Sequence, residues 1–249
     1  MTTRRLTLTT LVSLCVLAMG LLPPGTPAQA ALTHDHLSQI TEVPASSSAP
    51  LTGRLSEIEG MTVDSDDLYV VDHRSGTREH RLDKFNASSG KFISQIVHNS
   101  EDEEFVVGGG VAVGHSTGEA VVYAGATEHY LTSKVPVVAA FGESGSLLRT
   151  WEGTDTPNGA FGEVSDIAVD NSTSLADWAA GDVYVVDRRN ALVDVFEPQA
   201  EGKEKYVTQL TGTEPEPGVH VPFSHPSRVS VDESNGDVSI KPNSPRAYL

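Results

Sequence analysis

The sequence predicts an all-β fold of repeated four-stranded units, the architecture of a β-propeller, from two observations. First, a bulky apolar residue is followed six positions later by a short β-rich run, and this phrase occurs four times, at Leu55, Phe105, Phe161 and Phe223. The copies are about 50, 56 and 62 residues apart, in the range of propeller repeats or slightly longer. Second, short runs of β-branched and aromatic residues recur after each copy. A β-sandwich is the alternative, but it does not explain a constant offset in four copies.

The first thirty residues have the features of an export signal. Arg4 and Arg5 give a basic start, an apolar stretch follows over 6–22, and a small-x-small cleavage pattern stands at 28–30. We therefore expect a signal peptide over 1–30, secretion of the mature chain, and no stable membrane insertion after cleavage. A retained membrane anchor is the alternative, although the stretch is short for a spanning helix.

The composition restricts the partners and the chemistry. The chain has 34 acidic and 17 basic residues, a net charge of −17, and loss of Arg4 and Arg5 with the signal takes it to about −19. Such a charge repels phosphate backbones, so no nucleic-acid partner is expected. The single cysteine, Cys15, lies in the signal, so the mature chain has no disulfide, no cysteine-ligated zinc and no thiol nucleophile.

Each of the first three units is expected to hold four strands, because its apolar runs are short, β-branched or aromatic, and bounded by turn residues. First strands are expected at 61–64, 111–114 and 167–170, and second strands at 68–72, 121–125 and 183–187. Third strands are expected to end at Phe85, Phe141 and Phe196. Fourth strands are expected at 91–97, 147–151 and 205–210.

The two ends of the repeat region are expected to be incomplete. The fourth unit starts normally at 229–232 and 236–238, but Pro242 and Pro245 argue against a continuing central strand. Residues 36–40 resemble a fourth strand and indicate an orphan outer strand. We therefore expect about three complete blades with partial N- and C-terminal units, as in a truncated or frame-shifted product. A four-bladed ring closed by the N-terminal strand is the alternative.

These elements divide the chain into four parts. They are a signal peptide at 1–30, an N-terminal segment at 31–54, propeller repeats at 55–240 and an irregular tail at 241–249.

Residues 182–196 resemble the core of an NHL repeat. An apolar strand ends at Asp187, Asn190 follows three residues later, and a second apolar strand ends at Phe196. Residues 223–232 are similar to the NHL pattern before the first strand. The resemblance implies an NHL-type propeller, usually six-bladed, and some enzymatic members hold zinc and calcium in a central channel. Unit two departs from the pattern, with Gly125 in place of the Asp, and unit one has an insertion at 75–79.

Three residues are candidates for ligand binding near the channel: Asp166, Asp187 and His225. The alternative for Asp187 is that it caps the next turn through backbone N–H groups. The nine histidines form no His-Glu-x-x-His motif, and the acidic run 101–104 lacks the spacing of a calcium loop. No cofactor is therefore expected from the residues, and calcium or zinc rests on the resemblance alone.

The predicted function is a secreted, non-catalytic binding or scaffold module for a protein or small-molecule ligand. Its recognition surface would be the loops before the first strands, at 56–60, 101–110, 158–166 and 219–228. Gly108-Gly109-Gly110 enters a strand, which indicates close backbone packing near the axis. The alternative function is an extracytoplasmic metal-dependent propeller lyase or hydrolase.

Overall fold

The computed structural model describes residues 39–74, 79–100, 105–116, 118–130, 133–173, 177–199 and 204–242, all within one compact unit, Ser38–Leu249. The predicted signal peptide, residues 36–38 of the predicted outer strand, the acidic run 101–104 and residues 243–249 lie outside the described residues. Every regular element in the described part is a β-strand. No helix there is long and apolar enough to cross a membrane.

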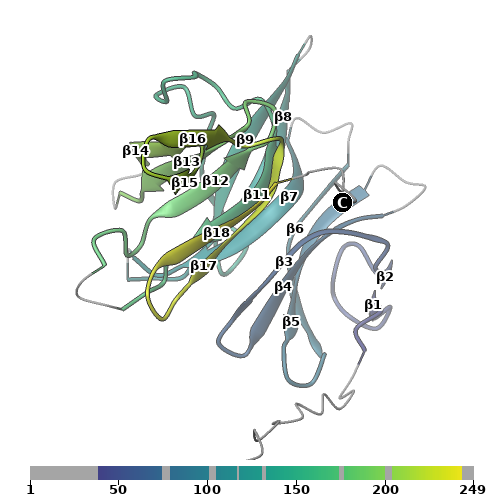
Figure 1. Cartoon of the computed structure of the whole chain (residues 1–249). Coiled ribbons are helices and arrows are strands. Elements are labelled where there is room, and N and C mark those ends of the chain that lie inside the picture. Colours follow the sequence, from purple (N-terminus) through teal and green to yellow (C-terminus); the bar gives the residue numbers. More distant parts are fainter. Residues whose placement is uncertain are drawn as a thin grey trace, which may run out of the picture. The chain divides into compact units, whose positions relative to one another are not determined.

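Three four-stranded antiparallel sheets follow one another along the chain, as the repeats predict (Figure 1). Sheet I comprises β3 (Glu57–Asp64), β4 (Asp67–His73), β5 (Glu79–Asn86) and β6 (Phe92–Ser100). Sheet II comprises β7 (Phe105–Gly114), β8 (Val121–Tyr130), β9 (Ser133–Gly142) and β10 (Leu147–Trp151). Sheet III comprises β11 (Val164–Val169), β12 (Val183–Asp187), β13 (Leu192–Glu197) and β14 (Lys205–Leu210).

The fourth unit has two strands among the described residues. Sheet IV pairs β17 (Pro226–Asp232) with β18 (Asp237–Pro242). Strand β18 extends two residues beyond the predicted end at Ile240. Pro242 is the last residue of β18, and the outer edge of β18 has no partner strand in the described chain. Its lack of an N–H therefore removes no hydrogen bond to a further strand.

Two short hairpins were not predicted. β15 (Gly212–Glu216) pairs with β16 (Val219–Pro222) just before β17, and β16 lies within the loop expected at 219–228. β1 (Glu42–Val43) pairs with β2 (Gly53–Arg54). Gln39 and Ile40, the described part of the predicted outer strand, are not in a strand, and β1 pairs with β2 rather than with sheet IV.

The core lies between successive sheets, which is the packing of propeller blades. One apolar cluster joins sheets I and II, with Tyr69 and Val122 fully buried. A second joins sheets II and III around Phe196, whose ring makes edge contacts with Trp151 and Phe161 at 6.0 and 5.9 Å. A third joins sheets III and IV. No sheet could bury both of its faces alone, which explains why the sequence repeats.

The first strands of the four units, β3, β7, β11 and β17, are neighbours at the centre, and two glycines allow their close approach. A Cβ added to Gly60 would lie 2.6 Å from the carbonyl oxygen of Gly109 on the next sheet. A Cβ on Gly110 would lie 2.5 Å from the backbone nitrogen of Ile167. The predicted close backbone packing of the triple glycine is confirmed.

The segment that precedes β3 covers the outer face of sheet I. Val43 is fully buried against Val70 and Phe85. The fully buried Arg81 fixes this segment: its guanidinium donates to Asp72 Oδ2 at 2.9 and 3.1 Å, and to three backbone carbonyls between Leu51 and Arg54 at 2.8–3.3 Å. The buried cation therefore has a charge partner and hydrogen-bond acceptors, as burial requires.

Candidate functional site

All four first strands carry a β-bulge near their start, at the same end of the inner strands. The register shifts lie between Ile58 and Gly60 in β3, Val107 and Val111 in β7, Val164 and Asp166 in β11, and Pro226 and Arg228 in β17. Bulges leave a residue unpaired and redirect its side chain, and they are frequent beside functional sites. They also explain why the strands begin before the predicted positions.

The bulged residues surround a cavity of about 840 Å³, which we call the mouth. Its wall includes Glu59, Gly108, Gly109, Ser165 and Ser227, one or two from each first strand. These positions fall within the four loops that the sequence indicated as a recognition surface. The structure therefore brings parts of all four loops together.

The mouth is basic in a strongly acidic protein. Among the described residues, five basic side chains line it, namely Lys134, Arg188, Arg189, Arg228 and Lys241, and two acidic ones, Glu59 and Glu163. The acidic run 101–104, which directly precedes β7, lies outside the described residues. The ratio of basic to acidic residues is thus one to two in the whole chain and five to two at the mouth. Because salt screens charges beyond about 8 Å, the charges that line the mouth matter more for the potential there than the net charge of the whole chain.

Arg228 is the cation with the most central position. Its guanidinium lies 3.3 Å from the carbonyl oxygen of Glu59 and 3.4 Å from those of Ser165 and Ser227, so it connects β17 to β3 and β11. These are long contacts to neutral acceptors. Among the described residues no carboxylate lies within ion-pair distance of Arg228, and its charge acts on the nearby carboxylate of Asp166.

The two acidic residues of the mouth are already engaged. Glu163 pairs with Arg188 at 3.0 Å. Glu59 accepts a hydrogen bond from the N–H of Gly109 at 3.2 Å and lies 4.0 Å from His80. Burial raises the pKa of Glu59 by disfavouring its charged form, against the hydrogen bond from Gly109.

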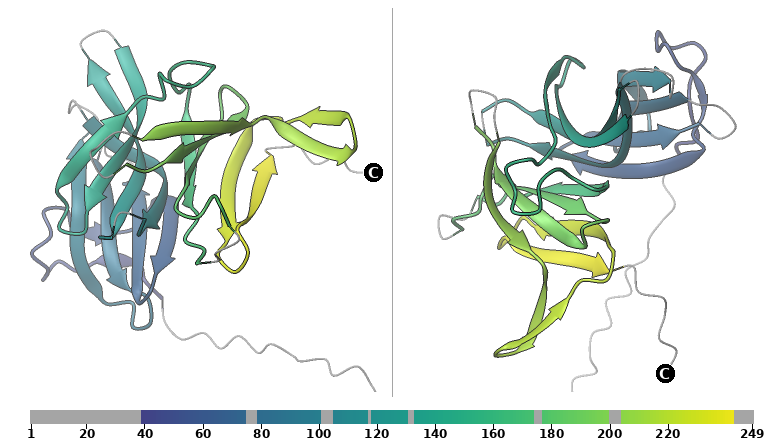
Figure 2. Two further views of the ribbon diagram at one scale, coloured as in Figure 1. Left: turned by 90° about the vertical axis from the view of Figure 1, so that its left-hand side faces the viewer. Right: turned by 90° about the horizontal axis from the view of Figure 1, so that it is seen from above.

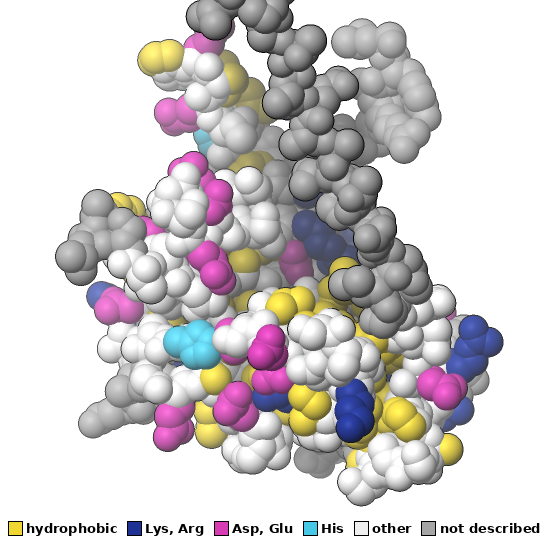
Figure 3. Space-filling view, turned by 90° about the horizontal axis from the view of Figure 1, so that it is seen from below, with side chains coloured by type: hydrophobic (Ala, Val, Ile, Leu, Met, Phe, Trp, Pro, Cys, Tyr) yellow, Lys and Arg dark blue, Asp and Glu magenta, His cyan; other side chains and the backbone are white. Residues whose placement is uncertain are grey.

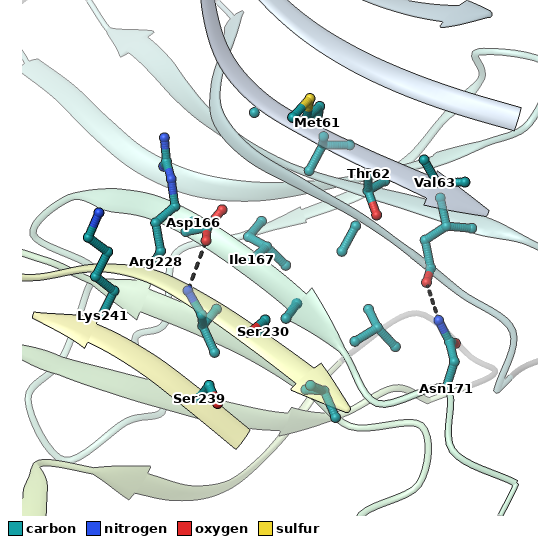
Figure 4. A pocket seen from close by; sticks show the side chains of 18 of the residues that line it. Met61, Thr62, Val63, Asp166, Ile167, Asn171, Arg228, Ser230, Ser239 and Lys241 are labelled. Atoms are coloured by element: carbon teal, nitrogen blue, oxygen red, sulfur yellow. Dashed lines mark hydrogen bonds between the residues drawn. The ribbon is translucent and has the colours of Figure 1, made fainter. Parts of the chain in front are cut away.

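A second cavity of about 660 Å³ continues from the mouth along the inner strands, and we call it the channel. Figure 4 shows Thr62 and Met61 on one side and Ser230, Ser239 and Lys241 on the other. Glu59, Arg228 and Lys241 line both cavities, so the basic mouth opens into a channel with hydroxyl groups on its wall.

Asp166 lies on the channel wall, as the sequence indicated (Figure 4). Its Oδ2 accepts the N–H of Val229 at 2.9 Å, so it joins β11 to β17. Burial raises the pKa of Asp166, against the backbone hydrogen bonds and the nearby charge of Arg228. These contacts make it a structural bridge whose ligand role stays a prediction.

Asp187 lies outside both cavities and has the contacts of a cap. Its buried carboxylate accepts hydrogen bonds from the N–H groups of Gly162 and Glu163 at 3.0–3.2 Å and from Asn190 at 2.8–3.3 Å. Asp72, its counterpart in sheet I, likewise accepts the N–H of Ser56 at 2.7 Å. The capping alternative therefore accounts for the environment of this position in both units.

His225 is exposed, has a positive φ of 48° and lines neither cavity. The structure therefore places one of the three predicted site residues at the channel and does not bring the three together. Within the described ranges no three His, Cys, Asp or Glu side chains are arranged to hold a metal ion. Calcium or zinc thus has no ligand set there.

The sequence did not single out the basic residues of the mouth. Arg188 and Arg189 directly follow the predicted second strand of unit three, and Arg228 directly precedes the predicted first strand of unit four. The position of these basic residues at predicted strand ends was the available signal. Lys134 could not be found this way, because it enters from the β8–β9 hairpin.

Comparisons with known proteins give distant structural similarity only. No protein-family model and no curated protein matches the chain. Kuenenia stuttgartiensis hydrazine synthase is similar at 12% identity with a TM-score of 0.44, over 75% of this chain and 58% of that one. An auxiliary nutrient binding protein from Bacteroides thetaiotaomicron is similar at 15% identity with a TM-score of 0.41, over 76% of this chain and 47% of that one. The periplasmic gluconolactonase of Pseudomonas aeruginosa is similar at 13% identity with a TM-score of 0.31, over 76% of this chain and 71% of that one.

The chain thus spans about half of the first two of these structures. TM-scores below 0.5 carry no inference about activity, and the NHL resemblance stays a prediction.

Proposed function

We propose that this protein is a secreted, NHL-type β-propeller binding module that holds an anionic ligand at the mouth. The observation that carries the proposal is the reversal of charge among the described residues of the mouth, five basic to two acidic, in a chain with twice as many acidic as basic residues. No catalytic step, cofactor or nucleic-acid partner is part of the proposal.

The end of the first strands that lies opposite the mouth carries acidic residues, so charge differs between the two ends. The first strands of sheets I and IV end at Asp64, which lies 3.0 Å from His115, and at the exposed Asp232. Figure 3 views the molecule from the side where the β3–β4 and β17–β18 turns lie in Figure 1, and acidic side chains are spread over that face. An anion is therefore repelled at one end and attracted at the other.

The ligand chemistry follows from the donors. Arg228 and Arg189 offer planar guanidinium groups, which bind carboxylate or phosphate oxygens in pairs. Lys134 and Lys241 add point charges. We therefore expect a small multivalent anion that presents several oxygens.

Isothermal titration with citrate at low ionic strength tests the proposal. The wild type should bind with a heat that decreases as salt is added, since the attraction is electrostatic. The Arg189→Ala/Arg228→Ala variant should bind at least about tenfold more weakly, because charged hydrogen bonds contribute about 1.5–3 kcal/mol each. Lys91→Ala, which removes an exposed cation from a turn away from the mouth, is the matched control. Equal affinity in the double variant would contradict the proposal.

A further inference from the structure

Among the described residues, sheet IV has two strands where the other three sheets have four. In sheets I, II and III the second strand pairs with a third, but β18, the second strand of sheet IV, has no partner on its outer edge in the described chain. Val207 and Leu210 on β14, which the missing strands would face, are only partly buried. An open edge of this kind presents unpaired N–H and C=O groups to another strand.

The β15–β16 hairpin forms a two-stranded sheet that pairs with no further strand in the described chain. Every residue of both strands is exposed except the half-buried Gly212, with Val219 at 46% and Val221 at 47%. Both views of Figure 2 show this hairpin projecting away from the sheets. A two-stranded hairpin on its own is marginally stable in water, so it is expected to have a partner.

The hairpin supplies what sheet IV lacks. Val219 and Val221 alternate on β16, as Val238 and Ile240 do on β18. Antiparallel pairing, the mode of every strand pair described, with His220 opposite Ser239 sets Val219 beside Ile240 and Val221 beside Val238. Pro215 lies within β15 and would interrupt a ladder, so β16 is the strand that pairs.

The hairpin cannot reach this edge within its own chain. In that register Pro222 lies beside Asp237, whereas Pro226 pairs with Pro242 at the other end of sheet IV. The distance along the sheet is about 16 Å for the five strand steps from Asp237 to Pro242. The four steps from Pro222 to Pro226 span at most about 14 Å.

We propose that the hairpin β15–β16 of one copy of this protein completes sheet IV of a second copy. The hairpin immediately precedes β17, so reciprocal exchange gives a closed two-fold dimer in which each copy both donates and accepts. Both fourth sheets then have four strands, and the exposed valines are buried against Val207 and Leu210. This inference is independent of ligand binding at the mouth.

Sedimentation and light scattering at about 100 μM, enough to populate a complex of micromolar affinity, test the proposal. The wild type should be a dimer that dissociates on dilution. Val219→Lys/Val221→Lys should be a monomer with an unchanged circular dichroism spectrum, because these side chains are exposed in the monomer. Leu148→Lys, at an equally exposed leucine on β10, should remain a dimer. A monomeric wild type at this concentration would overturn the proposal.

A cross-link fixes the register. In a Cys15→Ser background, His220→Cys with Ser239→Cys should form a disulfide-linked dimer under oxidation, since opposed residues in a ladder have Cβ atoms about 4.5–5.5 Å apart. If Ser239→Cys alone gives the same dimer, β18 pairs with β18 of the second copy and the hairpin proposal is wrong. Absence of any cross-link in the double variant also contradicts it.

Discussion

Buried aspartates at one repeated position have a raised pKa. Asp83 pairs with Gln95 across the ladder of sheet I, and Asp194 pairs with Gln209 at the corresponding place in sheet III. Burial raises the pKa of each to about 6, although the glutamine amide donates a hydrogen bond at 2.7 or 2.8 Å. Desolvation is therefore stronger than this hydrogen bond and, for Asp83, also stronger than the attraction of the Arg81 guanidinium, whose Nε lies 3.1 Å from its Oδ2.

Asp194 should reduce stability as the pH rises. The carboxyl of Asp194 holds its proton more tightly in the folded chain than in the unfolded chain, where its pKa is about 3.9. The free energy of unfolding therefore falls between about pH 4 and pH 6 and then levels off. Asp194→Asn should match the wild type near pH 4 and be more stable by roughly 2 kcal/mol at pH 7. Urea unfolding across this range measures the difference.

Asp187→Asn is the charge-matched control for that experiment. It should be destabilised by about 1–3 kcal/mol, because an amide cannot accept from all the N–H groups that surround this position. A constant difference between Asp194→Asn and wild type at all pH values would contradict the account of Asp194.

Arg81 should be the most sensitive single residue of the N-terminal segment. Arg81→Met leaves Asp72 as a buried carboxylate without its cation and frees three carbonyls, so the free energy of unfolding should fall by about 3–5 kcal/mol. Protease cleavage within 44–55 should also become faster. Arg54→Met, at an exposed arginine of the same segment, should change stability by no more than about 0.5 kcal/mol. Similar stability of the two variants would show that Arg81 is not the anchor.

At the scale of elements, the close approach of the first strands depends on glycine at defined positions. Gly110→Ala would place its Cβ 2.5 Å from backbone atoms of β11, which cannot move independently of the sheet. A loss of at least about 2 kcal/mol in thermal or urea unfolding is expected. Gly108→Ala is the control on the same strand, because its Cβ would meet only the flexible end of Glu59, at 3.0 Å. Equal losses would mean that strand approach is not the cause.

The existence of the strands was more predictable than the residues at which they start and end. Runs such as 183–187 are short and β-branched, and the predicted bounds agree with β12 residue for residue. The bulges at the strand starts depend on tertiary packing, so β7 begins six residues before its predicted start. The β15–β16 hairpin was missed because Pro215 and the glutamates around it read as loop.

At the scale of the whole molecule, the functional proposal rests on how charge is distributed rather than on net charge. The net charge of −17 indicates exclusion of anions, whereas the mouth collects five cations from different sheets and turns. The segments that supply the first-strand residues of the mouth could be predicted, because they precede the recurring first strands. The basic mouth could not, because Lys134 and Arg228 are more than ninety residues apart in the sequence and meet only in the fold.

Mapping a bound anion onto the chain tests the central claim most directly. Citrate titrated into isotope-labelled protein, followed by amide chemical shifts at low ionic strength, should perturb Gly108, Gly109, Ser165 and Ser227, which line the mouth. Amides of the acidic turns at the other end of the inner strands, such as Ser234 and Asn235, should not move. Perturbation at those turns, or none at the mouth, would contradict an anion-binding mouth.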